Sequence, residues 1–224
     1  MTPEEILLRI QQTKRRLESL RNFLESRGFE FQCPGEVLPG PDLHSPEVMA
    51  KIERAAGQVP DAIRQFYSII GSVNFNGHHP HWNGCDYPDA LIVFPVVFAE
   101  EELANFLSDR EEYLGAYGSF RIPVAPDYYH KEGVSGGMWY GVPVPAESAD
   151  PPLLEEPHST TFLRYLEIAL SWGGFPGLEH ANLNHTWPLS DLGNAASEPS
   201  VPLNGGSATP WNNSDITEGP PSVS

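Results

Sequence analysis

The 224-residue sequence contains little cysteine and no long apolar run, and both shortages bear on where the protein works. Its two cysteines, Cys33 and Cys85, form no C-x-x-C pair. One disulfide is possible, but the composition favours two reduced thiols in a cytosolic protein. The N-terminus lacks the apolar stretch of a secretory signal, and no window approaches the ~18 apolar residues of a membrane span. We therefore expect a cytoplasmic protein.

Positive charge is also scarce. The chain has 13 Lys and Arg against 30 Asp and Glu, a formal net charge of −17. A nucleic-acid binder needs a basic face that releases phosphate counterions, and docking on anionic lipid needs clustered Lys and Arg. The sequence therefore predicts no nucleic-acid partner and no membrane partner, and it favours a basic protein as the binding partner.

Residues 1–28 contain the clearest helix signal. Thr2 and Glu5 form a capping box with Pro3 at the first helical position, and Gly28 supplies a stop. Six residues, five of them apolar, recur at steps of four and three: Ile6, Ile10, Thr13, Leu17, Leu20 and Leu24. This stripe favours a helix packed on its own domain. The alternative is a short coiled-coil seam, which would support a weak homodimer.

Residues 29–181 predict one α+β domain, in which helices pack around a mostly antiparallel sheet. The expected helices lie at 45–57, 61–71, 100–114 and 160–172, and the expected strands at 73–75, 90–94, 120–125 and 137–144. In the helix at 100–114, Leu103, Phe106, Leu107 and Leu114 should point inward.

The composition changes at about residue 182. Pro, Gly, Ser and Asn make up 23 of the last 43 residues, and Lys and Arg are absent after Arg164. Such a segment buries too little apolar surface to offset its ordering entropy, so residues 182–224 are predicted to be a disordered tail. Trp187 and Trp211 are its only large anchors.

Two motifs suggest chemistry, and neither has the right context. His78, His79 and His81 with Cys85 and Asp86 could ligate zinc, but a second ligand pair is missing, so a polar turn without metal is favoured. Residues 133–137 match G-x-S-x-G around Ser135, with Asp150 and His158 following. A nucleophile elbow needs a buried strand before the serine and a helix after it. We expect no enzyme and no cofactor.

Acidic residues cluster in two runs between residues 100 and 112. The structural interpretation is a solvated helix face, and the functional interpretation is a negative surface that attracts a basic partner. The predicted partner-binding residues are Glu100, Glu101, Glu102, Asp109, Glu111 and Glu112.

Several segments, in order along residues 45–180, resemble the SUKH superfamily (Smi/Knr-like and Syd-like proteins). The segments that carry the resemblance are Val59-Pro60, Phe66-Tyr67, Gly71, Val73-Asn74-Phe75, Gly77 to Trp82, Ala125-Pro126-Asp127, His130-Lys131, Ser135-Gly136-Gly137, Tyr140, Phe162 to Leu166 and Trp172 to Gly177.

The resemblance implies an α+β domain that binds proteins and has no catalytic residues to carry over. Many bacterial members are immunity proteins that neutralise a toxin, often a nuclease or deaminase, by direct binding, and a chain of this charge suits a basic toxin. A regulatory scaffold without a toxin is the alternative, and a hydrolase or metalloenzyme the lesser one. The residues that could line a cleft are His79, Trp82, Asp127, His130, Lys131 and Tyr140.

Overall fold

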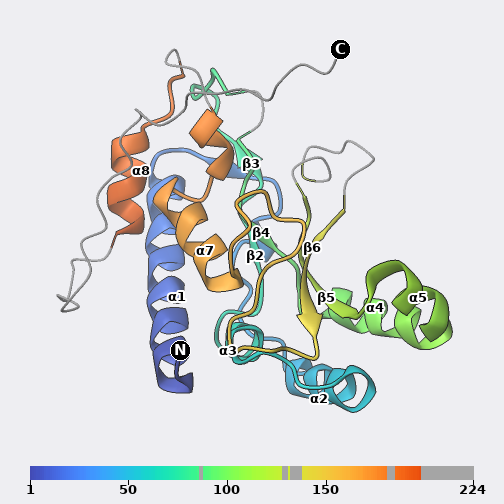
Figure 1. The fold of residues 1–224 in the computed structure, drawn as a ribbon. Helices are drawn as coiled ribbons and strands as arrows, with labels where there is room; N and C mark the ends of the chain where they lie inside the picture. Colours follow the sequence, from blue (N-terminus) through green and yellow to red (C-terminus); the bar gives the residue numbers. More distant parts are fainter. Residues whose placement is uncertain (86–87, 128–130, 132–137, 181–184, 198–224) are drawn as a thin grey trace, which may run out of the picture.

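The computed structural model describes residues 1–85, 88–127, 131, 138–180 and 185–197. The fold is α+β, as the sequence predicted (Figure 1). In chain order its elements are α1 (Pro3–Ser26), β1 (Glu30–Phe31), η1 (Pro34–Glu36), α2 (Ser45–Ala56), α3 (Asp61–Ile69), β2 (Val73–Asn74), β3 (Gly77–His78), β4 (Ile92–Val93), α4 (Val96–Ser108), α5 (Arg110–Tyr117), β5 (Phe120–Ala125), β6 (Tyr140–Val144), α7 (Phe162–Ser171), η2 (Pro176–His180) and α8 (Leu189–Ala196).

The described strands form three antiparallel pairs, β1–β3, β2–β4 and β5–β6. In the longest pair Phe120 lies opposite Val144 and Ile122 opposite Val142, with an irregularity in register between Pro123 and Ala125. The Phe94 N–H donates to the Val124 carbonyl at 2.7 Å, which joins the end of β4 to β5. The second and third pairs therefore meet side by side in the middle of the molecule.

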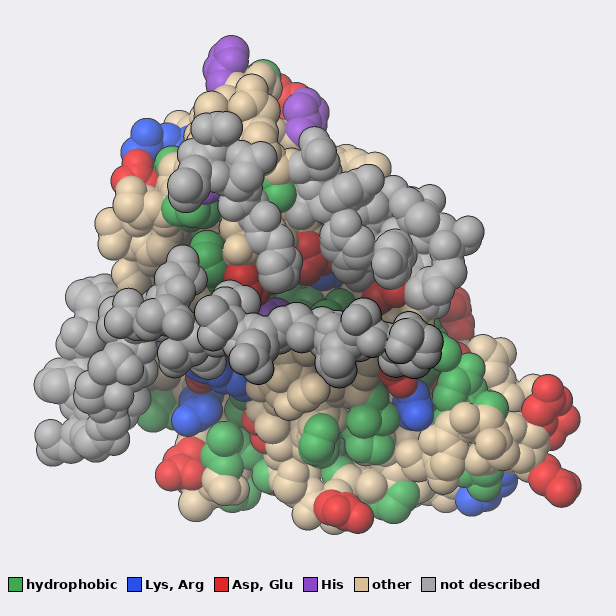
Figure 2. Space-filling model, turned by 45° about the horizontal axis from the view of Figure 1, so that its top comes forward, with side chains coloured by type: hydrophobic (Ala, Val, Ile, Leu, Met, Phe, Trp, Pro, Cys, Tyr) green, Lys and Arg blue, Asp and Glu red, His purple; other side chains and the backbone are tan. Residues whose placement is uncertain are grey.

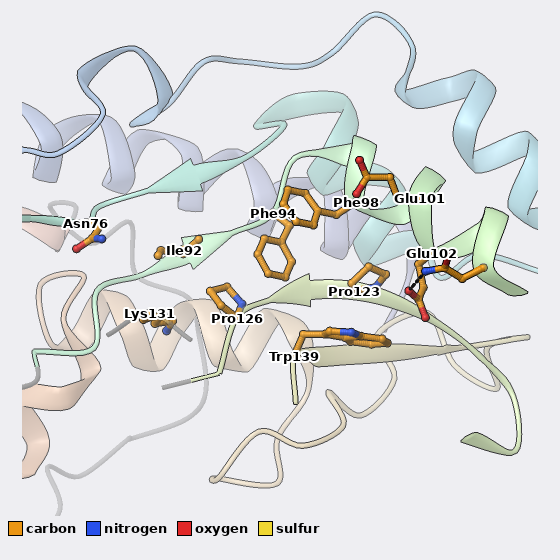
Figure 3. Close-up of a pocket in the computed structure, with 11 residues that line it drawn as sticks. Asn76, Ile92, Phe94, Phe98, Glu101, Glu102, Pro123, Pro126, Lys131 and Trp139 are labelled. Atoms are coloured by element: carbon orange, nitrogen blue, oxygen red, sulfur yellow. Dashed lines mark hydrogen bonds between the residues drawn. The ribbon is translucent and has the colours of Figure 1, made fainter. Parts of the chain in front are cut away.

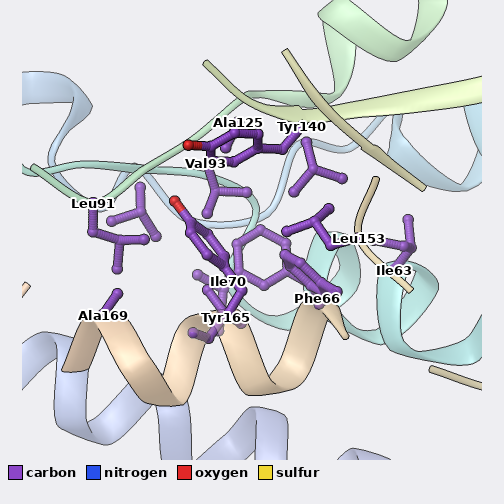
Figure 4. Close-up of a cluster of buried hydrophobic side chains, with 14 of the residues drawn as sticks. Ile63, Phe66, Ile70, Leu91, Val93, Ala125, Tyr140, Leu153, Tyr165 and Ala169 are labelled. Atoms are coloured by element: carbon purple, nitrogen blue, oxygen red, sulfur yellow. The ribbon is translucent and has the colours of Figure 1, made fainter. Parts of the chain in front are cut away.

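The core lies between these strands and α3 and α7 (Figure 4). Phe66 of α3 meets the Phe162 ring edge-on, with centroids 5.1 Å apart, and Tyr140 of β6 meets Tyr165 of α7 at 5.9 Å. Val93 and Ala125 contribute the strand side of the same cluster. Because the strands alternate their side chains, this packing leaves their other face turned toward α4.

The N-terminal helix α1 is part of the core. Thr2 accepts a hydrogen bond from the Glu5 N–H, and Glu5 accepts one from the Thr2 N–H, so the predicted capping box is present. All six residues of the stripe from Ile6 to Leu24 are buried, and the helix packs on α3, α7 and α8. The stripe is therefore covered within the chain, and a homodimer through α1 would have to use another face of the helix.

The single helix predicted at 100–114 is two helices. The chain leaves α4 at Ser108, and the Asp109 side chain accepts the Glu112 N–H at 3.0 Å, which caps α5. The capping residue Asp109, followed three residues later by Glu112, therefore marks the end of α4 and the start of α5. Of the predicted inward positions, Leu103 and Phe106 are on the buried face of α4, whereas Leu107 of α4 lies beside that face and is exposed. Leu114 belongs to α5 and is also exposed.

The prediction of a disordered segment over 182–224 is wrong for residues 185–197. Leu192 of α8 is fully buried, and the Trp187 ring packs against Phe29, Trp82 and Phe175. Arg16 of α1 donates to the Ala196 carbonyl oxygen. Composition did not reveal this segment because burial of only two large apolar side chains, Trp187 and Leu192, is enough to hold it against the core. Residues 182–184 and 198–224 lie outside the described part of the chain.

Within the residues that the structure describes, no helix has the length and apolar character needed to cross a membrane.

Candidate functional site

The face of the strands turned away from the core carries partly exposed aromatic side chains. Leu91 and Val93 are buried in the core, so the alternating residues Ile92 and Phe94 point to the opposite face. Phe94 stacks on Phe98 of the first turn of α4, with ring centroids 4.4 Å apart and planes 10° apart. Phe98 remains 41% exposed, which leaves an apolar surface open to a ligand.

A pocket of about 490 Å³ lies at this face, between α4 and the ends of β4, β5 and β6 (Figure 3). That volume is within the range of ligand-binding sites. In the close-up, Phe94 and Phe98 lie on one side, Trp139 on the other, and Pro123 and Pro126 between them. The lining residues are Asn76, Ile92, Phe94, Phe98, Glu101, Glu102, Asn105, Pro123, Pro126, Lys131 and Trp139.

Trp139 owes its position to the glycine two residues further along the strand. A Cβ atom on Gly141 would lie 2.4 Å from the Trp139 ring, so only glycine leaves room for the indole there. The centroid of the indole lies 6.5 Å from that of the Tyr117 ring. The wall opposite α4 is therefore built from Trp139, the residue immediately before β6.

Two carboxylates mark one end of the pocket. Glu101 and Glu102 extend from α4 at the end away from Asn76 and Lys131. Glu102 accepts a hydrogen bond from the Asn105 amide at 3.1 Å, and Glu101 has no hydrogen bond or ion pair to the described residues. This end of the pocket can therefore accept hydrogen bonds from a positively charged group.

The opposite end contains an ion pair that is almost fully buried. Lys131 Nζ lies 2.7 Å from Asp89 Oδ1, and the two side chains are 2% and 17% exposed. The ammonium also lies 5.9 Å from the centre of the Tyr140 ring. Because Asp89 balances Lys131, the charge that the pocket offers to a ligand is that of Glu101 and Glu102.

The six residues of the predicted acidic face do not all lie on one surface. Glu100 points to α2, where its carboxylate lies 2.8 Å from Lys51 Nζ, and hydrogen bonds with Glu100 and Glu47 raise the pKa of Lys51. Asp109 is the cap of α5, and Glu111 and Glu112 occupy its exposed first turn. Figure 2 shows acidic side chains projecting from the right-hand edge, where Figure 1 places α4 and α5. Of the six predicted residues, Glu101 and Glu102 line the pocket.

The predicted cleft residues fall into two groups. Lys131 lines the pocket, and Tyr140 is buried beneath it, where desolvation raises the pKa of its hydroxyl. Asp127 is buried at the end of β5, and its carbonyl accepts the Lys131 N–H at 3.2 Å. His79 and Trp82 belong to a separate aromatic cluster with Phe29 and Trp187. His130 lies outside the described residues.

The histidine cluster at residues 78–81 is held by contacts within the protein. His79 stacks on Trp82 with centroids 4.2 Å apart, and its Nδ1 accepts the His81 N–H at 3.1 Å. Its Nε2 lies 2.8 Å from the Arg27 carbonyl, so the proton is on Nε2. Over the described positions, no group of three or more His, Cys, Asp or Glu side chains is arranged to hold a metal ion. Asp86 is outside those positions.

The residues of the hydrolase hypothesis have other partners. Asp150 accepts the Leu163 N–H at 3.2 Å near the start of α7, and burial raises the pKa of Asp150. The His158 ring lies between two glutamates, 2.6 Å from Glu156 and 3.0 Å from Glu179. Ser135 and the rest of the G-x-S-x-G motif lie outside the described residues.

The contacts of His158 predict a pH dependence of folding stability. Partial burial alone would lower the pKa of His158, but hydrogen bonds with Glu156 and Glu179 outweigh it and raise that pKa above 6.5. A raised folded-state pKa means that protonation favours the folded state. The contribution is complete below the unfolded-state pKa and is lost as the pH rises through the folded-state pKa.

We therefore expect His158→Gln to destabilise the protein more at about pH 6 than at about pH 8, measured by urea denaturation. His44→Gln is the control, because His44 is exposed and its hydrogen bond to Asp42 uses only the backbone N–H. An equal loss of stability at both pH values would show that the ring charge of His158 does not stabilise the fold.

The aromatic walls of the pocket were missed from the sequence. In the sequence-based prediction, Phe94 ends the strand at 90–94, Phe98 precedes the helix at 100–114, and Trp139 belongs to the strand at 137–144. The sequence did contain a usable signal, because Ile92 and Phe94 alternate with Leu91 and Val93 and all four are apolar. A strand with apolar residues on both faces is usually covered by other elements on both faces. Which element covers it depends on tertiary packing.

Comparison with protein-family models, with curated proteins and with solved structures finds no match to this chain. The resemblance to the SUKH superfamily therefore stays a prediction that rests on the sequence motifs.

Proposed function

We propose that the protein is a non-catalytic binding module that holds a basic protein partner at the pocket between α4 and the β5–β6 pair. The observation that carries the proposal is the combination in one pocket of apolar aromatic walls and two carboxylates, Glu101 and Glu102. Aromatic surface supplies contact area, and carboxylates at the edge select a partner of opposite charge.

The charge of the whole chain supports the same partner class. A formal net charge of −17 produces a negative potential that attracts a basic protein before contact. The exposed first turn of α5, with Glu111 and Glu112, extends this potential beyond the pocket. We assign the long-range attraction to the chain as a whole and the specific contact to the pocket.

The biological role that fits best is that of an immunity protein, which neutralises a basic toxin by occupying it in the cytoplasm. Two features support this role: the acidic, aromatic pocket and the order of the SUKH-like motifs along residues 45–180. A toxin that acts on nucleic acid has a basic cleft, which is a suitable surface for this pocket. A near-stoichiometric basic protein, retained on the tagged chain at low salt and lost at high salt, is the expected partner.

Charge reversal should distinguish the contribution of the pocket glutamates to binding from that of the glutamates on α5. We expect Glu101→Lys with Glu102→Lys to slow association with that partner by about tenfold or more and to flatten its salt dependence, because both steering and contact are lost. The measurement is the association rate constant by surface plasmon resonance at several salt concentrations.

The matched control is Glu111→Lys with Glu112→Lys, which makes the same change of charge on the neighbouring helix. It should slow association less and leave the dissociation rate unchanged. If both double variants slow association equally, contact at the pocket is disproved. If neither has an effect, the proposal of an acidic binding surface is disproved.

A further inference from the structure

We infer that the pocket is a recognition site for an arginine side chain, which the partner inserts between Phe98 of α4 and Trp139, with its guanidinium against Glu101. This inference rests on the proposed function and specifies the chemical group that the pocket takes. It commits to one occupant, an arginine presented by a protein.

The walls fit the shape of an arginine. In Figure 3, Phe98 and Trp139 approach the pocket from opposite sides, and Pro123 lies between them. An arginine has an apolar three-carbon stem that can pack on such walls, and a planar head group that stacks on aromatic faces. The open edge at Phe98 gives the side chain a route in from solvent.

The charges fit the head group. Glu101 has no ion pair within the described part of the chain, whereas Glu102 accepts a hydrogen bond from the Asn105 amide and also interacts with the Tyr113 hydroxyl. A guanidinium offers five N–H donors in a fixed planar array, which can reach a carboxylate through two parallel hydrogen bonds and still meet a second acceptor. The two glutamates on one helix turn supply those acceptors.

Arginine is favoured over lysine for two reasons. A guanidinium is weakly hydrated and stacks on rings, whereas an ammonium is a strongly hydrated point charge. The protein already uses this contact: Arg121 lies 5.1 Å from the centre of the Tyr117 ring, next to Trp139, and Arg110 lies 5.1 Å from that of Phe106. The same ring–guanidinium geometry is available to an incoming arginine.

The test is a titration of the full-length protein with three capped tripeptides, Gly-Arg-Gly, Gly-Lys-Gly and the citrulline analogue of the first. Citrulline has nearly the shape of arginine without its charge. The readout is the indole N–H signal of Trp139 in a nitrogen-15 NMR spectrum, assigned with Trp139→Phe. We expect the arginine peptide to shift this signal and to bind about tenfold more tightly than the citrulline peptide.

Three variants locate the site. Glu101→Gln, which keeps the size and removes the charge, should weaken arginine binding by about tenfold. Gly141→Ala should weaken it as well, because the new methyl group displaces the Trp139 ring, and its stability is checked by thermal unfolding. Glu111→Gln on α5 is the matched control and should bind the peptide as the parent chain does.

Equal binding of the arginine and citrulline peptides, or a Trp139 signal that does not move, would overturn the inference. Equal binding of arginine and lysine peptides would overturn the preference for a guanidinium. If the arginine peptide fails and the Glu101–Glu102 reversal still slows association with the partner, the inference is wrong and the proposed function stands. If both experiments fail, both are wrong.

Discussion

A chain that ends at His180 is expected to unfold about 10–20 °C below the full-length protein in a thermal scan. The deletion removes α8 and the buried side chains of Trp187 and Leu192. Loss of a buried Trp or Leu side chain costs about 2–5 kcal/mol each. The face of α1 that α8 covers also becomes exposed. The deletion also removes Thr186, whose hydroxyl joins the His81 carbonyl and the Asn83 N–H.

A chain that ends at Ser197 is the control for this deletion. It retains every contact that the structure describes, so its unfolding temperature should equal that of the full-length protein. Equal unfolding temperatures for the two shortened chains would show that α8 does not stabilise the core. The Ser197 chain also tests the scaffold alternative, because a scaffold that uses its C-terminal segment should lose partners when residues 198–224 are removed.

The second large effect is expected at Gly71, where α3 ends. Its φ angle is +89°, and a Cβ atom there would lie 2.0 Å from the Gly40 carbonyl oxygen. Gly71→Ala therefore combines a left-handed backbone conformation with a clash against backbone that cannot move away cheaply. We expect a loss of about 3 kcal/mol in the free energy of unfolding, measured by urea denaturation.

Gly115→Ala is the matched control for Gly71→Ala. Gly115 lies inside α5, and nothing lies within 4 Å of the position its Cβ would take. Alanine is the better helix former, so this variant should gain about 0.5–1 kcal/mol. Equal effects of the two substitutions would mean that the close approach of Gly71 to Gly40 is not what requires glycine there.

Helix boundaries with a local chemical signal could be predicted from the sequence. The Thr2–Glu5 capping box and the Ser45-Pro46 start gave the beginnings of α1 and α2, and the α+β class followed from the order of such elements. At α7, Thr161 accepts the Arg164 N–H, close to the predicted start at 160. These features depend on residues within one or two turns of each other.

Features that depend on distant contacts could not be predicted. The helix α8 has a composition typical of disorder, and it forms because Leu192 packs where Gly173 has no side chain: a Cβ on Gly173 would lie 2.4 Å from that of Leu192. The pocket joins Phe98, Pro123 and Trp139 from three separate segments of the chain. Glu100 and Glu101 are adjacent in the sequence, but Glu100 points to Lys51 of α2 and Glu101 points to the pocket. Sequence spacing alone does not show that Lys51 lies near Glu100.

The contact between α1 and α8 has a consequence for how the chain folds. Arg16 and Ala196 are 180 positions apart in the sequence, and Arg27 and Asp191 are 164 apart, yet each pair is joined directly. The helix α1 is thus synthesised long before α8, which covers part of it. Contacts between such distant positions slow folding, because a long loop must close before they form. Until α8 arrives, the nascent chain exposes an apolar strip of α1, and that strip is where chaperones or a second unfinished chain would bind first.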